Sequence, residues 1–203
     1  MIGRSKFTHI IGIDEVGRGP LAGPVAVGAF VILKPEAKKI FKKVKESKQL
    51  REAQREAWFA VIKKCQNEKL VDFAVTFQSE KIIDTKGLSF AIRTALNRSL
   101  AAVVKRTKMK PREILVLLDG GLKAPREYVN QQTIIKGDEK EMVIALASIC
   151  AKVLRDRRMI TLSKKYPQYG FEKHKGYGSR AHYDALKKYG LLPIHRKSFL
   201  RAR

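Results

Sequence analysis

Cysteine and histidine are scarce in this sequence, and their scarcity excludes several kinds of site. The two cysteines, Cys65 and Cys150, lie far apart and form neither a CxxC pair nor a Cys/His ligand pattern. The four histidines form no HExxH motif. We therefore predict a reduced, cytoplasmic protein without a disulfide framework, a structural zinc site or a metalloprotease centre.

Long apolar runs are also absent. No stretch of about eighteen apolar residues is present, so no membrane-spanning helix is predicted. The apolar run Ile10 to Ile13 is too short for a secretory signal and is followed at once by two acids. No amphipathic segment combines an aromatic face with lysines, so we expect no membrane partner.

Acidic residues are few relative to basic ones. The chain has 19 acidic and 43 basic residues, which gives a net charge of +24. This charge attracts polyanions, and a nucleic acid is the predicted partner. A cationic surface without a specific partner, or a ribosome-associated protein, stays open at this level. The length favours one domain over residues 1–203, monomeric, with roughly 165–203 as a C-terminal helical extension and basic tail.

The most informative stretch is HIIGIDEVGRGPLAGP, from His9 to Pro24. A short apolar run delivers Asp14 and Glu15 directly into the turn Gly17-Arg18-Gly19. Carboxylates at the end of a buried strand need a cation, a metal or several hydrogen-bond donors. Glycine permits a sharp turn and a close approach to a ligand, and an arginine fork suits phosphate. The alternative is a turn with two solvated acids.

A second apolar run, ILVLL at 114–118, delivers Asp119 to Gly120-Gly121, and Asp138 follows Gly137. Asp14, Glu15, Asp119 and Asp138 are thus candidate oxygen ligands for a pair of divalent cations that cleave a nucleic-acid backbone.

Each acid also has a structural interpretation. Adjacent strand residues point to opposite faces, so Asp14 and Glu15 share a site only if the strand ends or bends at Glu15. Asp119 could shape a turn with Gly120. Asp138 and Glu141 have the spacing of a capping box that opens a long helix, so Asp138 is a cap, a ligand or both.

Hydrophobic periodicity predicts a mixed α/β sheet with helices on both faces. The first two strands should form an antiparallel hairpin, and segment 36–48 is left unassigned. The helix VIALASICAKVL is apolar almost all round and should pack tightly on the sheet. Asp156 follows Lys152 by four residues and is interpreted as an ion-pair partner. The predicted strands are 10–13, 25–33, 71–77, 114–118 and 133–136, and the predicted helices are 51–67, 88–105, 140–164 and 180–189.

Several motifs, in order, resemble those of ribonuclease HII, the bacterial type 2 ribonuclease H. GIDEVGRGPLAGP resembles its opening motif, with Val16 where alanine is more usual. ESKQL resembles a motif that usually begins Asp-Ser-Lys, with Glu46 and Gln49 as departures. The resemblance covers roughly residues 10–199. The other matching segments are LLDGG, KGDEKEMVIALASICAKVLRDRRM, YPQYGFEKHKGYGS and HRKSF.

The resemblance implies a ribonuclease H-like fold, with a five-stranded mixed sheet flanked by helices and a C-terminal helical part. It implies cleavage of the RNA strand of RNA–DNA hybrids and incision 5′ of single ribonucleotides in duplex DNA, leaving 3′-hydroxyl and 5′-phosphate ends. It also implies two Mg²⁺ or Mn²⁺ ions. By position, the metal-binding carboxylates are Asp14, Glu15, Asp119 and Asp138; the nucleic-acid-binding residues are Gly17, Arg18 and Gly19 around the ribonucleotide, Ser47 and Lys48, and Tyr177 at the RNA–DNA junction.

Two alternatives remain at this level. Type 3 ribonuclease H shares the fold and much of the opening motif, but it usually carries an extra N-terminal domain, and only about a dozen residues precede the predicted catalytic strand here. A non-catalytic basic protein that binds RNA or DNA is permitted by the charge alone, but it gives the acids at the strand ends no role.

Overall fold

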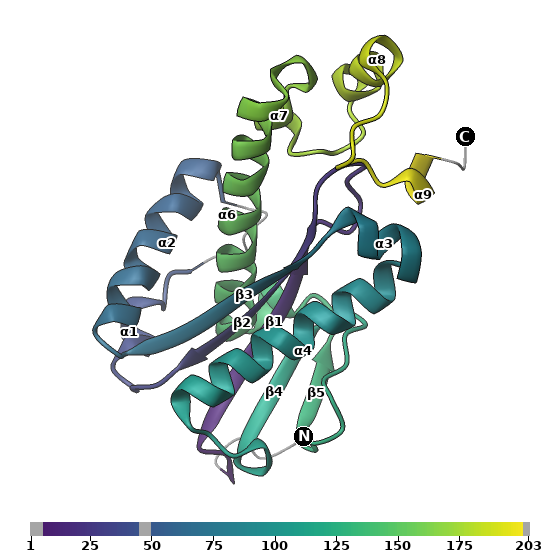
Figure 1. Cartoon of the computed structure of the whole chain (residues 1–203). Coiled ribbons are helices and arrows are strands. Elements are labelled where there is room, and N and C mark those ends of the chain that lie inside the picture. Colours follow the sequence, from purple (N-terminus) through teal and green to yellow (C-terminus); the bar gives the residue numbers. More distant parts are fainter. Residues whose placement is uncertain (1–5, 45–49, 201–203) are drawn as a thin grey trace.

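The computed structural model describes residues 6–44 and 50–200, and its centre is a five-stranded sheet in the order β3-β2-β1-β4-β5 (Figure 1). β1, β2 and β3 pair antiparallel, whereas β1, β4 and β5 pair parallel. The predicted hairpin and mixed sheet are therefore confirmed. The strands are β1 His9–Val16, β2 Val25–Ile32, β3 Val71–Gln78, β4 Ile114–Asp119 and β5 Gln131–Ile134.

Helices cover both faces of the sheet, as predicted. α4 lies on one face, and α2 and α6 lie on the other (Figure 1). The helices are α1 Ala37–Ile40, α2 Glu52–Asn67, α3 Glu80–Lys86, α4 Leu88–Thr107, α5 Gly137–Lys140, α6 Met142–Lys165, α7 Phe171–His174, α8 Arg180–Tyr189 and α9 Lys197–Leu200, with short 3₁₀ turns η3 Pro111–Glu113 and η4 Pro167–Tyr169. No helix in these described ranges is long and apolar enough to cross a membrane.

Several boundaries differ from the sequence prediction, and some helices were not predicted. β1 was predicted over residues 10–13 but runs from His9 to Val16, so both acids lie within the strand. β5 begins at Gln131, two residues earlier than predicted, because its pairing with β4 starts opposite Val116. The predicted helix from residue 140 begins instead at Met142, because residues 137–140 form the separate helix α5. α3 was not predicted, and its start is fixed by the Ser79 side chain, which accepts a hydrogen bond from the N–H of Ile82.

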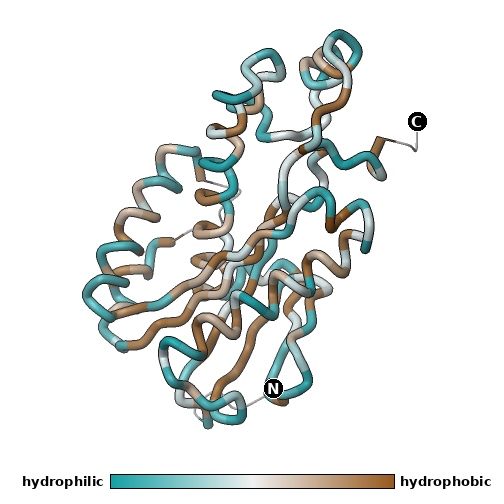
Figure 2. The backbone as a smooth tube through the Cα atoms, in the orientation of Figure 1, coloured by the Kyte–Doolittle hydropathy of each residue, from teal (hydrophilic) through white to brown (hydrophobic). Residues whose placement is uncertain are grey.

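Alternation along the strands divides the core into two layers. Ile11 and Ile13 of β1 pack with α4, whereas Leu115 and Leu117 of β4 pack with α2 and α6. β4 is apolar on both faces because helices cover both sides of it. Figure 2 shows this arrangement as brown strands enclosed by helices whose outer surfaces are mostly teal.

Two glycines let α6 approach the sheet closely. A Cβ atom on Gly12 would collide with the backbone of Val143, and one on Gly28 would collide with the carbonyl oxygen of Ala147. The register of β1 and β2 places Gly28 opposite Asp14. The tight packing predicted for this helix is confirmed, and it brings the next residue, Ser148, into hydrogen-bond contact with Asp14.

The far half of α6 extends beyond the sheet and contacts α7, whereas α8 packs on η4 and α9 lies near α3 (Figure 1). Met159 of α6, Tyr169, Phe171 and Ala185 form a small third core there, together with Ala22 from the loop after β1. The same loop pairs with the C-terminal segment through a bridge between Ala22 and His195. The predicted C-terminal helical part is therefore packed against the loop that follows the strand with the two acids.

Candidate active site

One pocket of about 440 Å³ lies where β1 and β4 end against the middle of α6. It contains three of the four predicted acids, the whole glycine turn and the predicted junction tyrosine. Residues predicted from segments more than 100 positions apart are thus brought together. The lining residues are Asp14, Glu15, Val16, Gly17, Arg18, Gly19, Arg55, Asp119, Ser148, Lys152 and Tyr177.

Asp14 is the most deeply placed acid of the pocket, with 5% of its surface exposed. Its Oδ1 accepts a hydrogen bond from the N–H of Glu15 at 2.8 Å. Burial raises the pKa of Asp14 to about 8, against the opposing effect of its hydrogen bond with Ser148. The charges of the other three predicted acids raise this pKa further, which places all four in one electrostatic neighbourhood.

Glu15 lines the same pocket as Asp14, although β1 does not end at Glu15 and stays paired with β2 through Val16. β1 ends at Val16, and Gly17 then turns the chain with a φ of +91°. Oε1 of Glu15 accepts a hydrogen bond from Nη1 of Arg18 at 2.8 Å. Oε2 is buried and has no hydrogen-bond partner in the described part of the chain. Burial raises the pKa of Glu15, and Arg18 opposes that rise.

Asp119 and Asp138 reach this neighbourhood from β4 and α5. The register that pairs Ile13 with Leu118 places Asp119 beside Asp14, and Oδ1 of Asp119 accepts from the N–H of Gly137 at 2.6 Å. Asp138 is buried at 3% exposure next to that glycine and is not among the residues that line the pocket.

The capping-box interpretation of Asp138 is wrong. α6 begins at Met142 with Glu141 as its N-cap residue, and no side chain caps it. The intervening helix α5 separates Asp138 from the start of α6, so the D-x-x-E spacing does not produce a cap here.

The donor set fits a hard divalent cation. Within the described ranges, no three Asp, Glu, His or Cys side chains are already arranged as a coordination group. Arg18 holds one oxygen of Glu15, and the N–H of Gly137 holds one oxygen of Asp119. Mg²⁺ needs no such trio, since it takes one or two carboxylates and completes its shell with water and substrate phosphate. The unpartnered Glu15 oxygen and the raised Asp14 pKa both indicate a site that a cation would stabilise.

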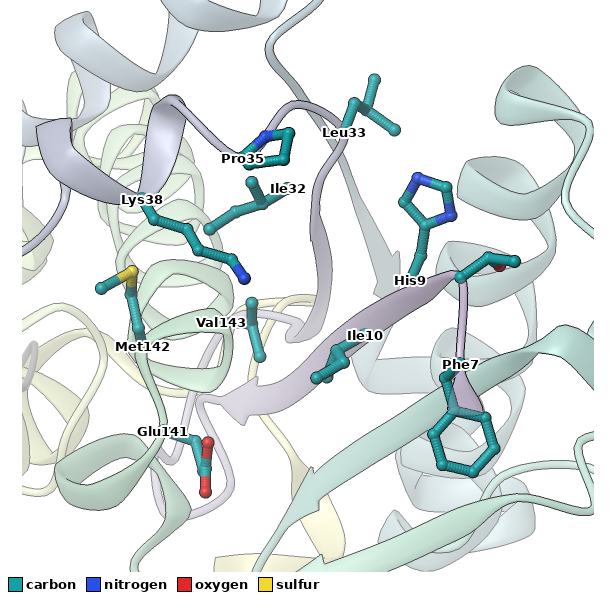
Figure 3. A pocket seen from close by; sticks show the side chains of 11 residues that line it. Phe7, His9, Ile10, Ile32, Leu33, Pro35, Lys38, Glu141, Met142 and Val143 are labelled. Carbon is teal, nitrogen blue, oxygen red and sulfur yellow. The ribbon is translucent and has the colours of Figure 1, made fainter. Parts of the chain in front are cut away.

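A second pocket, of about 510 Å³, lies at the other end of β1 (Figure 3). Phe7, His9 and Ile10 line one side of it, and Lys38 and Met142 line the other. It is larger than the acidic pocket but contains none of the four predicted acids. We therefore place the chemistry in the smaller pocket. Ser47 and Lys48, like Glu46 and Gln49, lie outside the described residues.

The ribonuclease HII family profile matches residues 11–202 of this chain. Ribonuclease HII of Endomicrobium trichonymphae is 44% identical over 193 residues, which covers 95% of this chain and 86% of that protein. Ribonuclease HII of Fusobacterium nucleatum is 43% identical over 198 residues, covering 97% and 87%. The chain belongs to the ribonuclease HII family. It is therefore a ribonuclease H, an endonucleolytic hydrolase, which sets aside the non-catalytic alternative.

Solved structures confirm the ribonuclease H-like fold. Ribonuclease H2 of Pyrococcus horikoshii superposes with a TM-score of 0.68 at 27% identity, covering 94% of this chain and 93% of that one. Ribonuclease HII of Archaeoglobus fulgidus, solved with PCNA, has a TM-score of 0.74 at 24% identity, covering 96% and 95%.

This ribonuclease HII pocket also contains polar residues that the sequence analysis did not select. Ser148 and Lys152 are one turn apart on α6, and Arg55 reaches the pocket from α2. The predicted pair of Lys152 and Asp156 is confirmed, with 2.7 Å between Nζ and Oδ1. Asp156 is buried and Lys152 is half-buried, and Arg55 lies 3.7 Å from the other oxygen of Asp156. The i, i+4 spacing was the available signal for this helix face.

Two histidines, His182 and His195, form a hydrogen-bonded chain that ends at the backbone carbonyl of Tyr177. Nδ1 of His195 accepts from the N–H of Leu192, so in the neutral ring Nε2 carries the proton and donates to Nε2 of His182 at 3.1 Å. His182 then donates through Nδ1 to the carbonyl of Tyr177 at 2.9 Å. One tautomer of each ring satisfies the whole chain, and an added proton would break it.

We expect acid to destabilise this part of the ribonuclease HII fold. Burial lowers the pKa of His195 to about 4, whereas the unfolded side chain titrates near 6.5. Between these values the unfolded state binds the extra proton, so stability is full above about pH 6.5 and is lost as pH falls. Urea unfolding of the wild type and of His195→Asn at pH 7.5 and pH 5 isolates this contribution, because the titration of Asp14 is common to both proteins. Lowering the pH should cost the wild type roughly 2 kcal/mol more than it costs His195→Asn; an equal pH slope in both proteins would contradict this.

Proposed function

We propose that this enzyme cleaves the RNA strand of RNA–DNA hybrids and incises 5′ of single ribonucleotides in duplex DNA, leaving 3′-hydroxyl and 5′-phosphate ends. We propose further that it acts in the cytoplasm as a monomer, with residues 1–203 as one catalytic unit. The observation that carries this proposal is the shared pocket. It joins Asp14, Glu15 and Asp119 to the Gly17–Gly19 turn and to Tyr177.

Asp14, Glu15, Asp119 and Asp138 would hold two Mg²⁺ or Mn²⁺ ions. A type 3 ribonuclease H, Bst-RNase HIII, has been solved in complex with Mn²⁺, and it shares the fold at 21% identity and a TM-score of 0.65. When bound, such ions activate water and stabilise the leaving oxygen. The protein's own contribution is orientation, since Ser148 contacts Asp14, Arg18 holds Glu15 and Gly137 holds Asp119.

The Gly17–Gly19 turn and Tyr177 would distinguish ribose from deoxyribose. The 2′-hydroxyl is both donor and acceptor, and exposed backbone groups of a glycine turn can approach it closely. Tyr177 is 44% exposed, with its ring 5.9 Å from the Arg155 guanidinium carbon. Its free surface is thus available to stack on a sugar or base at the junction.

Cations beside the acids would hold the substrate backbone. Lys152 and Arg55 line the pocket, and Ser47 and Lys48 are proposed as further nucleic-acid contacts. Because phosphate contacts release counterions, binding should weaken steeply as salt is raised.

The deciding experiment uses an end-labelled DNA duplex that contains one ribonucleotide. The full chain is incubated with it in Mg²⁺ or Mn²⁺, with chelator as control and an all-RNA hybrid in parallel. Incision on the 5′ side of the ribonucleotide supports the proposal. Cleavage of the hybrid alone would favour type 3 specificity, and the fold allows that alternative because Bst-RNase HIII superposes with a TM-score of 0.69 at 23% identity.

Tyr177→Ala is expected to reduce incision at a single ribonucleotide by roughly tenfold to hundredfold, because one stacking contact is worth about 1–3 kcal/mol. Tyr189→Ala is the matched control, since Tyr189 on α8 is similarly exposed at 47% but does not line the pocket. Steady-state kinetics of both variants on the same duplex make the comparison. Equal activity of the two variants would rule out the role proposed for Tyr177.

A further inference from the structure

Arg196 is an unusual side chain because it is charged, fully buried and held by backbone oxygens. Its exposed fraction is 0%. Its Nε donates to the carbonyl of Gly23 at 3.0 Å, Nη1 to that of Arg18 at 2.8 Å and Nη2 to that of Gly17 at 2.7 Å. Burial lowers the pKa of Arg196 to about 10, so the guanidinium stays protonated at neutral pH. Burying a charge costs free energy of desolvation, so we expect this arginine to have a structural or functional role.

The backbone around Arg196 holds the side chain in place. Its N–H donates to the carbonyl of Leu21 at 2.7 Å, and the preceding residue, His195, bridges to Ala22. The N–H groups of Leu21 and Ala22 both donate to the carbonyl of Gly176, next to Tyr177. The C-terminal segment, the loop after β1 and the tyrosine loop are thus connected through backbone hydrogen bonds.

Besides Arg196, a second buried guanidinium, that of Arg155, packs against the glycine turn. Arg155 is 0% exposed and donates through Nε to the carbonyl of Pro24 at 2.9 Å and through Nη1 to that of Lys175 at 3.1 Å. A Cβ atom on Gly17 would collide with the Arg155 side chain. The turn is therefore packed against Arg155 at Gly17 and cannot shift toward that side chain without steric overlap.

The direction of the two carbonyls determines the direction of the neighbouring N–H groups. All described peptide bonds are trans, and in a trans peptide the C=O and the following N–H point opposite ways. Because the carbonyls of Gly17 and Arg18 point to Arg196, the N–H groups of Arg18 and Gly19 point away from it. Both of these residues line the pocket that contains the acids.

We propose that Arg196 is a positioning residue for ribonucleotide recognition, which fixes the Gly17–Gly19 peptide planes so that the N–H groups of Arg18 and Gly19 face the substrate. This proposal rests on the proposed function of that turn. Lysine would keep the charge but cannot reproduce a planar fork that holds two carbonyls at once. Arg196 itself does not line the pocket and acts through the turn.

The test compares Arg196→Lys and Arg196→Met with Ser198→Ala. Ser198 lies in the same segment and donates to Asp84 at 2.6 Å, away from the turn, so its variant controls for loosening of the segment. Each protein is measured for kcat and KM on the single-ribonucleotide duplex, and for affinity in chelator toward that duplex and the same duplex in all-DNA form. Amide ¹H–¹⁵N signals of Arg18 and Gly19 are recorded without substrate.

We expect both Arg196 variants to lose roughly tenfold to hundredfold in kcat/KM, chiefly through KM, and to lose their preference for the ribonucleotide duplex. The two amide signals should move in Arg196→Lys and stay in Ser198→Ala. An Arg196→Lys protein with unchanged preference and unchanged amide signals would overturn the proposal, as would an equal loss of affinity for both duplexes. If Arg196→Met does not fold, Arg196→Lys carries the test. A wild-type protein without ribonucleotide preference would instead contradict the proposed function, and the amide signals would still decide whether Arg196 fixes the turn.

Discussion

Asp14→Asn is expected to reduce cleavage by at least about a thousandfold while leaving the metal-free protein at least as stable as the wild type. The loss of activity follows from removing a proposed metal ligand at the point where the charges of all four acids interact, since metal ions at such sites supply several kcal/mol of transition-state stabilisation. The stability follows from burial, since a neutral amide of the same shape avoids the desolvation that raises the pKa of Asp14 to about 8.

The sign of the pH effect follows from the same shift. The unfolded carboxyl ionises near pH 3.8, whereas the folded one keeps its proton up to about pH 8. The contribution of Asp14 to stability in chelator should therefore fall as pH rises through this window, and the advantage of Asp14→Asn over the wild type should grow to a few kcal/mol. Urea unfolding at pH 5 and pH 8 measures it. Asp184→Asn, at an exposed position of α8, is the control; substantial activity in Asp14→Asn would refute the assignment of Asp14.

Gly12→Ala is expected to destabilise the protein by about 3 kcal/mol or more, at the upper end of overpacking effects. The added methyl group would overlap the backbone of Val143, which cannot rotate aside as a side chain does. α6 would have to move away from β1, and Ser148 would move with it from Asp14. The variant should therefore lose activity even under conditions in which it stays folded.

Gly121→Ala is the matched control for this substitution. A Cβ atom on Gly121 meets nothing within 4 Å, and its φ is not positive. Chemical denaturation of both variants, with activity measured in the native baseline, separates the steric effect from a general loss of glycine flexibility. Equal stability of the two variants would show that the helix adjusts to the methyl group.

The sequence predicted the elements that bury apolar runs and carry acids at their ends. β1 was predicted because a short apolar run ends at Asp14, and β4 because the run ILVLL ends at Asp119. The parallel register of the two strands then places these acids side by side. The role of Asp138 was left open because D-x-x-E also matches a capping box, and only the separate helix α5 decides against the cap.

The arginines were not predictable by the same reasoning. Arg155 and Arg196 are two among 43 basic residues, and composition favours a solvated side chain for each. Apart from Lys175, which is 20 positions from Arg155, their carbonyl partners lie 131 to 179 positions away, and no local pattern records such contacts. Ser148 and Lys152 likewise lie on a helix whose small apolar residues indicated packing, although their i, i+4 spacing was visible.

The hydrogen bond between Arg196 and Gly17 has a consequence for the order in which the site is completed during synthesis on the ribosome. Residue 17 is synthesised early, but the side chain that orients its carbonyl follows 179 positions later. Chains emerge from the N-terminus, and contacts of such separation form last. The acids of β1 therefore exist without a completed turn while the residues between 17 and 196 are made. A nascent chain is accordingly expected to have no hydrolytic activity toward nearby nucleic acid until the residues around 196 have emerged and docked.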